Sequence, residues 1–363
     1  MSGRVACAYA SPGRWQPCAT ELKPPLVPAW SPPSAEDLVD APILGGGLAF
    51  CVSRPHGLVA VDVRTGEHVW RLEAERAWGS CQLSGDRLLA TPRPGRLAVL
   101  DPASGAERQS YAVHGILLQY GVVVDDRVVS PLDDSSLGAW DLAAGAFAWR
   151  VPTQWRPTLL AAGGGIVCVA EESAYVALDL ATGSERWRFD VAVLGRYTTI
   201  LWGERPGAAT RHPIIAGDSV YVGVTGGLLV ALDIASGMPR WTTQVGCPIP
   251  HNFALAPNGE LLHLADDALV AIDAATGAVR ARQLLNDAAG EAGDGPFAPM
   301  AVTERFVWAV DHRGRLAAIA RADGHIAWRA DLRGRVASPP VIADGRLLVV
   351  DLDGRLSVFR EAV

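Results

Sequence analysis

Residues 177–189 read ALDLATGSERWRF, and variants of this stretch recur along the whole chain. An apolar run leads to an aspartate, a Thr-Gly pair follows, and a tryptophan stands four residues after the glycine. The intervals between the glycines are 39, 40, 38, 54, 40 and 47 residues. A period near 40 residues with strand-like content predicts the blades of a β-propeller. The glycines are Gly66, Gly105, Gly145, Gly183, Gly237, Gly277 and Gly324.

Each part of the motif has a physical role in a four-stranded blade. The apolar run before the aspartate is typical of a strand, and the aspartate can accept hydrogen bonds from turn amides. The glycine supplies the positive φ that a tight hairpin needs. The tryptophan on the next strand can fill the wedge between neighbouring blades. A second hairpin lies upstream of each copy, as in residues 213–233, so we expect four strands per blade, A to D, from the inside outward.

The two ends of the chain decide the number of blades. Trp30 lies 40 residues before Trp70, in phase with the repeat, whereas after Trp328 the chain supplies three strands, at about 336–361, and no fourth. Closing the last blade with the N-terminal strand, residues 26–31, pairs the ends and removes exposed sheet edges. The prediction is an all-β fold: a single eight-bladed β-propeller of four-stranded blades over residues 26–363, after an N-terminal extension, residues 1–25. A seven-bladed ring is the alternative, but it leaves Trp30 and one set of three strands unexplained.

The repeat resembles that of the PQQ-like (quinoprotein-type) β-propeller family, and the resemblance covers the chain from about residue 26. It implies a fold more than an activity, because the motif is the structural skeleton of a blade. The family includes quinoprotein dehydrogenases, outer-membrane assembly lipoproteins and sensor domains attached to kinases. The dehydrogenases are longer and exported, and many carry two adjacent cysteines against the cofactor. None of the six cysteines of this chain is adjacent to another, so a PQQ cofactor is not expected.

Composition and charge narrow the function further. The 363 residues carry a net charge of −7, which argues against a nucleic-acid partner and against polybasic binding to a membrane. The sequence shows no recognisable signal peptide or membrane span. The chain is therefore interpreted as a cytoplasmic monomer, and the assembly lipoproteins are set aside because they are exported. The cysteine spacing indicates no metal site, and Cys51 and Cys168 lie in apolar runs, where buried thiols are the usual case.

The candidate site lies where the repeat is interrupted. In a propeller the connections from D to A and from B to C gather around one mouth of the central channel, where loops are free of the packing demands on the blades. The insertion 193–210 brings aromatic residues and arginines, and we expect it to fold over this mouth. The residues expected to bind a ligand there are Asp40, Trp78, Tyr120, Trp155, Arg156, Trp202, Arg205, Arg211, Asn252 and Phe297.

Two histidines at the mouth suggest a catalytic alternative. His212 and His251 begin adjacent A strands, so their side chains can converge beside Arg211 and Asn252. A general base beside a cation could transfer protons, whereas two histidines without a third ligand only weakly indicate a metal site. Two functions therefore stay open. One is a cytoplasmic propeller that binds a small molecule or a partner protein at the channel mouth. The other is a small-molecule enzyme (a lyase, cyclase or hydrolase, as in secondary metabolism) that uses these histidines.

Overall fold

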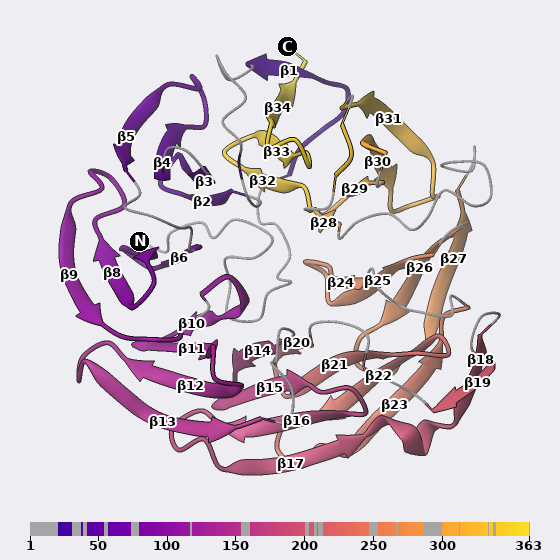
Figure 1. The fold of residues 1–363 in the computed structure, drawn as a ribbon. Coiled ribbons are helices and arrows are strands. Elements are labelled where there is room, and N and C mark those ends of the chain that lie inside the picture. Colours follow the sequence, from indigo (N-terminus) through magenta and orange to yellow (C-terminus); the bar gives the residue numbers. More distant parts are fainter. Residues whose placement is uncertain are drawn as a thin grey trace.

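The chain folds into a ring of eight four-stranded antiparallel sheets, with a separate two-stranded hairpin (Figure 1). These elements are counted over the residues that the computed structural model describes, which are 21–30, 38, 42–53, 57–73, 80–116, 118–153, 160–199, 203–206, 209, 213–246, 253–265, 268–285, 300–311, 313–332, 334–336 and 339–362. The predicted eight-bladed propeller is confirmed, and the seven-bladed alternative is wrong.

The strands follow one another from the inside of each blade outward. Blade 1 contains β2 (Ile43–Gly45), β3 (Leu48–Ser53), β4 (Gly57–Asp62) and β5 (His68–Leu72), and blade 2 contains β6 (Cys81–Ser84), β7 (Arg87–Arg93), β8 (Arg96–Leu100) and β9 (Glu107–Ala112). Blade 3 contains β10 (Val122–Val124), β11 (Arg127–Pro131), β12 (Ser136–Asp141) and β13 (Ala146–Pro152), and blade 4 contains β14 (Leu160–Gly163), β15 (Ile166–Ala170), β16 (Ala174–Asp179) and β17 (Glu185–Asp190).

The second half of the ring repeats this arrangement. Blade 5 contains β20 (Ile214–Ala216), β21 (Ser219–Val224), β22 (Leu228–Asp233) and β23 (Pro239–Gln244), and blade 6 contains β24 (Phe253–Leu255), β25 (Glu260–Leu264), β26 (Ala268–Asp273) and β27 (Val279–Leu284). Blade 7 contains β28 (Ala301–Val302), β29 (Phe306–Val310), β30 (Arg315–Ala320) and β31 (Ile326–Asp331). Blade 8 combines β32 (Val341–Ala343), β33 (Arg346–Val350) and β34 (Leu356–Glu361) with β1 (Leu26–Trp30). The remaining elements are two 3-10 helices, η1 (Leu118–Tyr120) and η2 (Val191–Leu194), and the hairpin strands β18 (Arg196–Thr199) and β19 (Gly203–Pro206).

Tryptophan rings join each blade to the next by packing on the glycine of the repeat. A Cβ atom at these glycines would lie 2.5 to 2.7 Å from an atom of the ring, and each glycine has a positive φ between 70° and 79°. Each indole N–H also donates to the backbone carbonyl of the residue after the turn aspartate, at 2.9 to 3.0 Å. Glycine is therefore required for two reasons: it adopts the positive φ of the turn, and it leaves space for the tryptophan ring. The pairs are Trp30 on Gly66, Trp70 on Gly105, Trp149 on Gly183, Trp187 on Gly237 and Trp241 on Gly277.

Two blades make this contact with a different residue from the one expected. The repeat predicts it at the fourth residue after the glycine, which is Gln109 in blade 2 and Ala281 in blade 6. The structure uses the sixth residue instead. Tyr111 packs on Gly145 and donates its hydroxyl to the Leu142 carbonyl, and Gln283 packs near Gly324. The fourth and sixth positions face the same side of a strand because side chains alternate.

The N-terminal segment closes the ring as predicted. β1 pairs antiparallel with β34, with Leu26 opposite Glu361, and Figure 1 shows β1 beside the C-terminus. The Trp328 indole donates to the Leu26 carbonyl at 3.0 Å, which repeats the contact of the other blades. Leu22, upstream of the strand, is fully buried in the core between blades 7 and 8.

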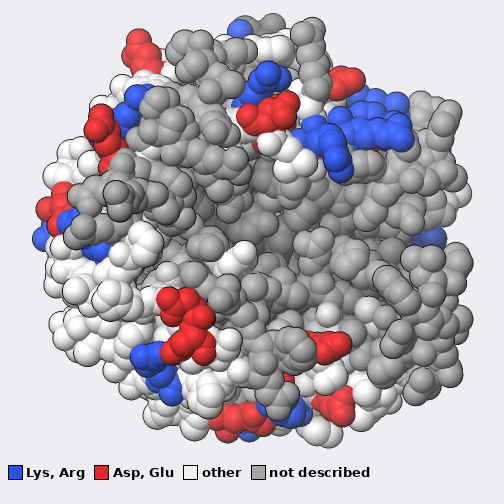
Figure 2. Space-filling model, viewed as in Figure 1, with Lys and Arg blue, Asp and Glu red and all other residues white. Residues whose placement is uncertain are grey.

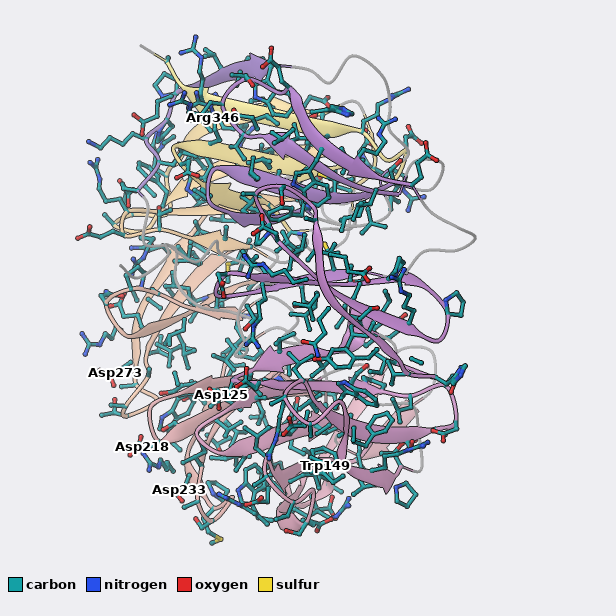
Figure 3. All side chains as sticks on the ribbon, turned by 90° about the vertical axis from the view of Figure 1, so that its left-hand side faces the viewer. Asp125, Trp149, Asp218, Asp233, Asp273 and Arg346 are labelled. Atoms are coloured by element: carbon teal, nitrogen blue, oxygen red, sulfur yellow. The ribbon has the colours of Figure 1, made fainter. Side chains whose placement is uncertain are left out.

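The turn aspartates hold the outer hairpins as the motif predicts. One carboxylate oxygen of Asp179 accepts hydrogen bonds from the amides of Ala181 and Thr182, and the other pairs with Arg186. The same two amide bonds form at Asp62, Asp101, Asp141, Asp233 and Asp273. Figure 3 shows Asp218, Asp233 and Asp273 together on one face of the ring.

Replacing a repeat tryptophan should strongly destabilise the fold. Trp187 is 7% exposed, so Trp187→Ala should lower the free energy of unfolding by about 3–5 kcal/mol, the usual cost for a large buried aromatic residue. The control is Met238→Ala, next to Gly237 and 66% exposed, which should change stability by less than about 0.5 kcal/mol. Urea unfolding measures both, and equal losses would contradict this role.

Removing the closing strand should open the ring. A chain without residues 1–30 loses the β1–β34 pairing, the buried Leu22 and the partner of the Trp328 indole. We expect a large drop in melting temperature relative to a chain without residues 1–20, which keeps every one of these contacts. If the two truncated chains melt together, β1 does not stabilise the ring.

The aspartate–arginine pairs should make the free energy of unfolding depend on pH in the acidic range. The pKa values of Asp101, Asp179 and Asp273 are lowered to about 2, first by hydrogen bonds from arginine side chains. Because these values lie below the ordinary 3.8, the stability they contribute is present above about pH 4. It should be lost as the pH falls toward 2. The triple variant with Asn at these positions keeps acceptors for the turn amides but does not titrate, so its urea midpoint should fall less between pH 5 and 2. Parallel curves would contradict the assignment.

Candidate functional site

The D-to-A and B-to-C connections lie on one face of the ring, which we call the loop face. Antiparallel order within each sheet requires this, because strand B returns to the side from which strand A started. Figure 2 views the loop face; acidic and basic side chains alternate along its left edge, and a group of basic ones lies together at the upper right. The opposite face carries the A-to-B and C-to-D turns, including those of Asp218 and Asp233.

Most of the predicted site residues fall outside the described part of the chain. Of the residues expected to bind a ligand, the structure describes the side chain of Tyr120 alone, and Arg205 belongs to β19, of which only the backbone is described. The predicted roles of the others therefore stay predictions. Those outside the described residues are His212, His251, Asp40, Trp78, Trp155, Arg156, Trp202, Arg211, Asn252 and Phe297.

Tyr120 lies at the end of η1, between the outer strand of blade 2 and the inner strand of blade 3. Leu118 anchors this short helix because its side chain is fully buried. Its carbonyl accepts hydrogen bonds from the Gly121 amide at 3.0 Å and from the buried Gln82 side chain at 3.5 Å. Tyr120 is half-buried. The contacts of Leu118 therefore fix the position of the short helix that carries the Tyr120 ring on the loop face.

The insertion 193–210 forms the β18–β19 hairpin, which pairs with no blade among the described strands. Figure 1 places this hairpin at the outer edge of the ring, on the side of β23 and β27, away from the ring centre. The chain then returns to the blades at Ala209, whose amide donates to the Glu172 carbonyl at 3.2 Å. The described part of the insertion does not extend over the channel mouth, unlike our expectation.

Acidic pairs in the B-to-C loops serve mainly as structural anchors. Asp134 pairs with Arg150 of β13, and Glu171 pairs with Arg188 of β17 at 2.6 Å. Each arginine lies on the outer strand of the blade that carries its carboxylate partner. Both carboxylates therefore point outward, away from the channel. Glu172, beside this pair, is exposed.

Two further carboxylates are buried within the loops of blades 7 and 8. Asp311 is 2% exposed and accepts hydrogen bonds from the amides of Arg313 and Arg315. Asp351 does the same for the amides of Asp353 and Arg355. These contacts fix the loop shape. Among the described residues no group of three His, Cys, Asp or Glu side chains could hold a metal ion.

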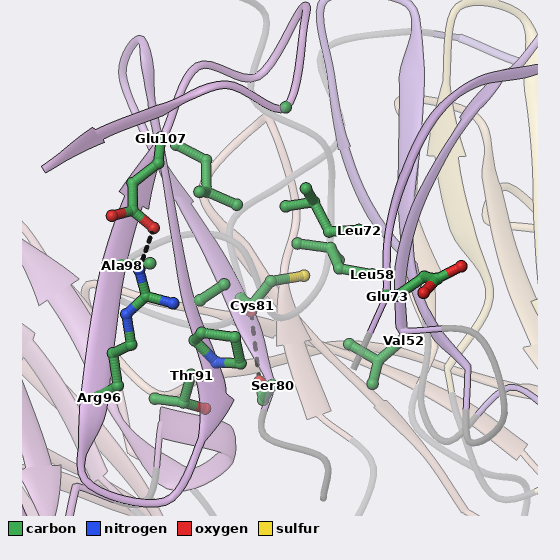
Figure 4. A pocket seen from close by; sticks show the side chains of 14 residues that line it. Val52, Leu58, Leu72, Glu73, Ser80, Cys81, Thr91, Arg96, Ala98 and Glu107 are labelled. Carbon is green, nitrogen blue, oxygen red and sulfur yellow. Dashed lines mark hydrogen bonds and ion pairs between the residues drawn. The ribbon is translucent and has the colours of Figure 1, made fainter. Parts of the chain in front are cut away.

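A cavity of about 150 Å³ lies between blades 1 and 2, and Tyr120 is not among the residues that line it (Figure 4). Leu58 and Leu72 form its wall on blade 1, and Cys81, Ala98 and Leu100 form the wall on blade 2. Ser80, Thr91 and the Arg96–Glu107 ion pair, at 2.5 Å, supply polar groups. This cavity was not predicted from the sequence, although Ala98 is smaller than the valine that four other repeats have at the same position.

Comparison with known proteins decides the family. The sequence model of the family described as "Outer membrane protein assembly factor BamB" matches residues 28–116, 114–256 and 265–362. The chain belongs to this family. The outer membrane protein assembly factor BamB of Burkholderia pseudomallei (strain K96243) is 25% identical over 333 residues, which cover 88% of this chain and 84% of that protein.

Other relatives share the fold over different lengths. The crystal structure of BamB from Moraxella catarrhalis superposes with a TM-score of 0.67 at 19% identity, over 93% of this chain and 100% of that chain. The quinohemoprotein alcohol dehydrogenase ADH IIB of Pseudomonas putida is 31% identical over 176 residues, but these cover 47% of this chain and 24% of that enzyme. The PQQ-like resemblance of the repeat is thus confirmed as a family relationship.

The prediction of a cytoplasmic location is wrong. Several relatives are named outer membrane protein assembly factors, which points away from the cytoplasm. The exclusion of the outer-membrane assembly proteins, which relied on that location, is therefore wrong as well. A blade packs the same core in any aqueous compartment, so neither the repeat nor the charge of the chain carried information on location. Among the described residues, no helix is long and apolar enough to cross a membrane.

Proposed function

We propose that this protein is a non-catalytic docking propeller that binds a partner protein through its loop face during the assembly of membrane proteins. The family match carries the proposal, because it runs from residue 28 to residue 362 and therefore includes blades from every part of the ring. Relatives that align over most of their own length are assembly factors. The dehydrogenase, in contrast, aligns over a quarter of its length.

Exposed apolar side chains on the loop face support a protein partner. Val193 of η2 is 73% exposed, Leu284 at the end of β27 is 63% exposed, and Leu352 in the B-to-C loop of blade 8 is 59% exposed. Each follows or ends a strand that runs toward the loop face. Protein interfaces combine such apolar groups with a polar rim, which exposed acidic residues such as Glu172 can supply.

Three described carboxylates of the loop face are already bound by other groups of the protein, which favours docking over catalysis. Asp134, Glu171 and Asp311 are all engaged by arginines or loop amides, which suits a rigid binding surface. The catalytic alternative rests on His212 and His251, and it makes a different prediction from docking for the same experiment.

Charged substitutions on the loop face should strongly reduce function without unfolding the protein. In cells that lack the gene, the amount of correctly assembled outer membrane protein should fall, and the wild-type gene should restore it. The Val193→Asp, Leu284→Asp double variant should restore less than about a third of it, because carboxylates disrupt an apolar contact. The control, Met238→Asp on the opposite face, should restore it fully, and all variants should melt within a few degrees of the wild type.

Two outcomes would contradict docking. The first is normal membrane-protein assembly in cells that lack the gene. The second is full function of the double variant together with loss of function in His212→Ala and His251→Ala, which would favour the enzyme.

A further inference from the structure

The cavity between blades 1 and 2 arises from two departures from the repeat. The residue three positions before the turn aspartate faces the preceding blade. It is valine in four blades, glycine in blade 3 and alanine in blades 2 and 7, where the alanines are Ala98 and Ala317. The four valines are Val59, Val176, Val230 and Val270.

In blade 3 another side chain fills the space that a small residue at this position leaves. Its residue at this position is Gly138, and the ring of Phe147 fills the space, because a Cβ atom at Gly138 would lie 2.7 Å from the Phe147 ring. Six residues after the turn aspartate, blade 2 has Glu107 where blade 3 has Phe147. The Glu107 carboxylate is held by Arg96 at 2.5 Å, so the side chain at this position of blade 2 does not fill the space beside Ala98. Blade 2 therefore retains a hollow that its neighbour fills.

The lining of this hollow is mostly apolar and carries few charges. Figure 4 shows the Cys81 sulfur pointing toward Leu58 and Leu72, whereas the Glu73 carboxylate points away from the cavity. Arg96 and Glu107 neutralise each other, so the wall offers no net charge to an ionic ligand. Ser80 and Thr91 place hydroxyl groups at the edge of the apolar wall, where they can hydrogen-bond one polar substituent.

We propose that this cavity is a binding site for a small uncharged aromatic compound with a single hydroxyl group. Its volume of about 150 Å³ matches the roughly 150 Å³ of an engineered apolar cavity that binds benzene in another protein. The ring lies between Leu58, Leu72 and Ala98, and the hydroxyl group faces Ser80 and Thr91. The lining includes Ser80 and Thr91, so the site lies toward the loop face between blades 1 and 2. None of the exposed apolar residues of the proposed docking surface lines it, and it does not depend on the proposed function.

Phenol is the probe that tests the site, and ligand-observed NMR titration of the full chain is the measurement. The wild-type protein should bind phenol saturably, and benzoate at least about tenfold more weakly, because the cavity cannot compensate its charge. Ala98→Leu fills the hollow and should weaken phenol binding by at least about tenfold. Ala317→Leu, at the same repeat position in blade 7, should leave the affinity within about twofold.

A milder substitution guards against misfolding of the first variant. Ala98→Val introduces the residue that four other blades carry at this position, so it should fold and still weaken phenol binding. Absence of saturable binding to the wild type would overturn the proposal. So would equal affinity of the wild type and a folded Ala98 variant, or binding of benzoate as tight as that of phenol.

Discussion

The packing of one tryptophan ring on one glycine is the interaction on which this ring of blades depends. The indole of the preceding blade packs directly on the glycine of the outer turn, where a Cβ atom would clash with the ring. The indole N–H then donates to the carbonyl beside the turn aspartate. Burial, shape and one directed hydrogen bond thus act at one place, and they fix the distance and the angle between neighbouring blades.

The exceptions show what the contact must supply. Where blade 6 has no tryptophan, Gln283 donates to the Ala322 carbonyl at 2.6 Å, and the turn aspartate of blade 7 is replaced by Ala320. Arg321, with 8% of its side chain exposed, then bridges Glu260 of blade 6 and the Glu304 carbonyl of blade 7. Polar contacts therefore replace the tryptophan–glycine contact between blades 6 and 7. The surrounding strands keep the same register, with Glu260 opposite Asp273 as Phe306 is opposite Ala320.

The sequence predicted the fold far better than the site, for a physical reason. A blade contact is local and repeats, so Trp30 in phase with Trp70 was enough to place the closing strand. The use of Tyr111 in place of Gln109 was not predictable from the motif, because two positions on one face of a strand can reach the same glycine. Loops such as 193–210 have no repeat to constrain them, and the β18–β19 hairpin lies toward the rim. The cavity depends on volumes on both sides of a blade contact, which become visible only when Ala98 and Glu107 are compared with Gly138 and Phe147.

Equivalent ring contacts, including the one closed by the N-terminal strand, hold the blades together as one cooperative unit. Hydrogen exchange of the tryptophan indole N–H groups, followed by NMR, tests this directly, because each docked indole reports on its own blade contact. The indoles of Trp70, Trp187 and Trp328 donate to Pro102, Ile234 and Leu26, and they should exchange with one common free energy, equal to that of global unfolding. A markedly lower free energy for Trp328 than for Trp187 would mean that the closing blade opens by itself, and it would contradict the account.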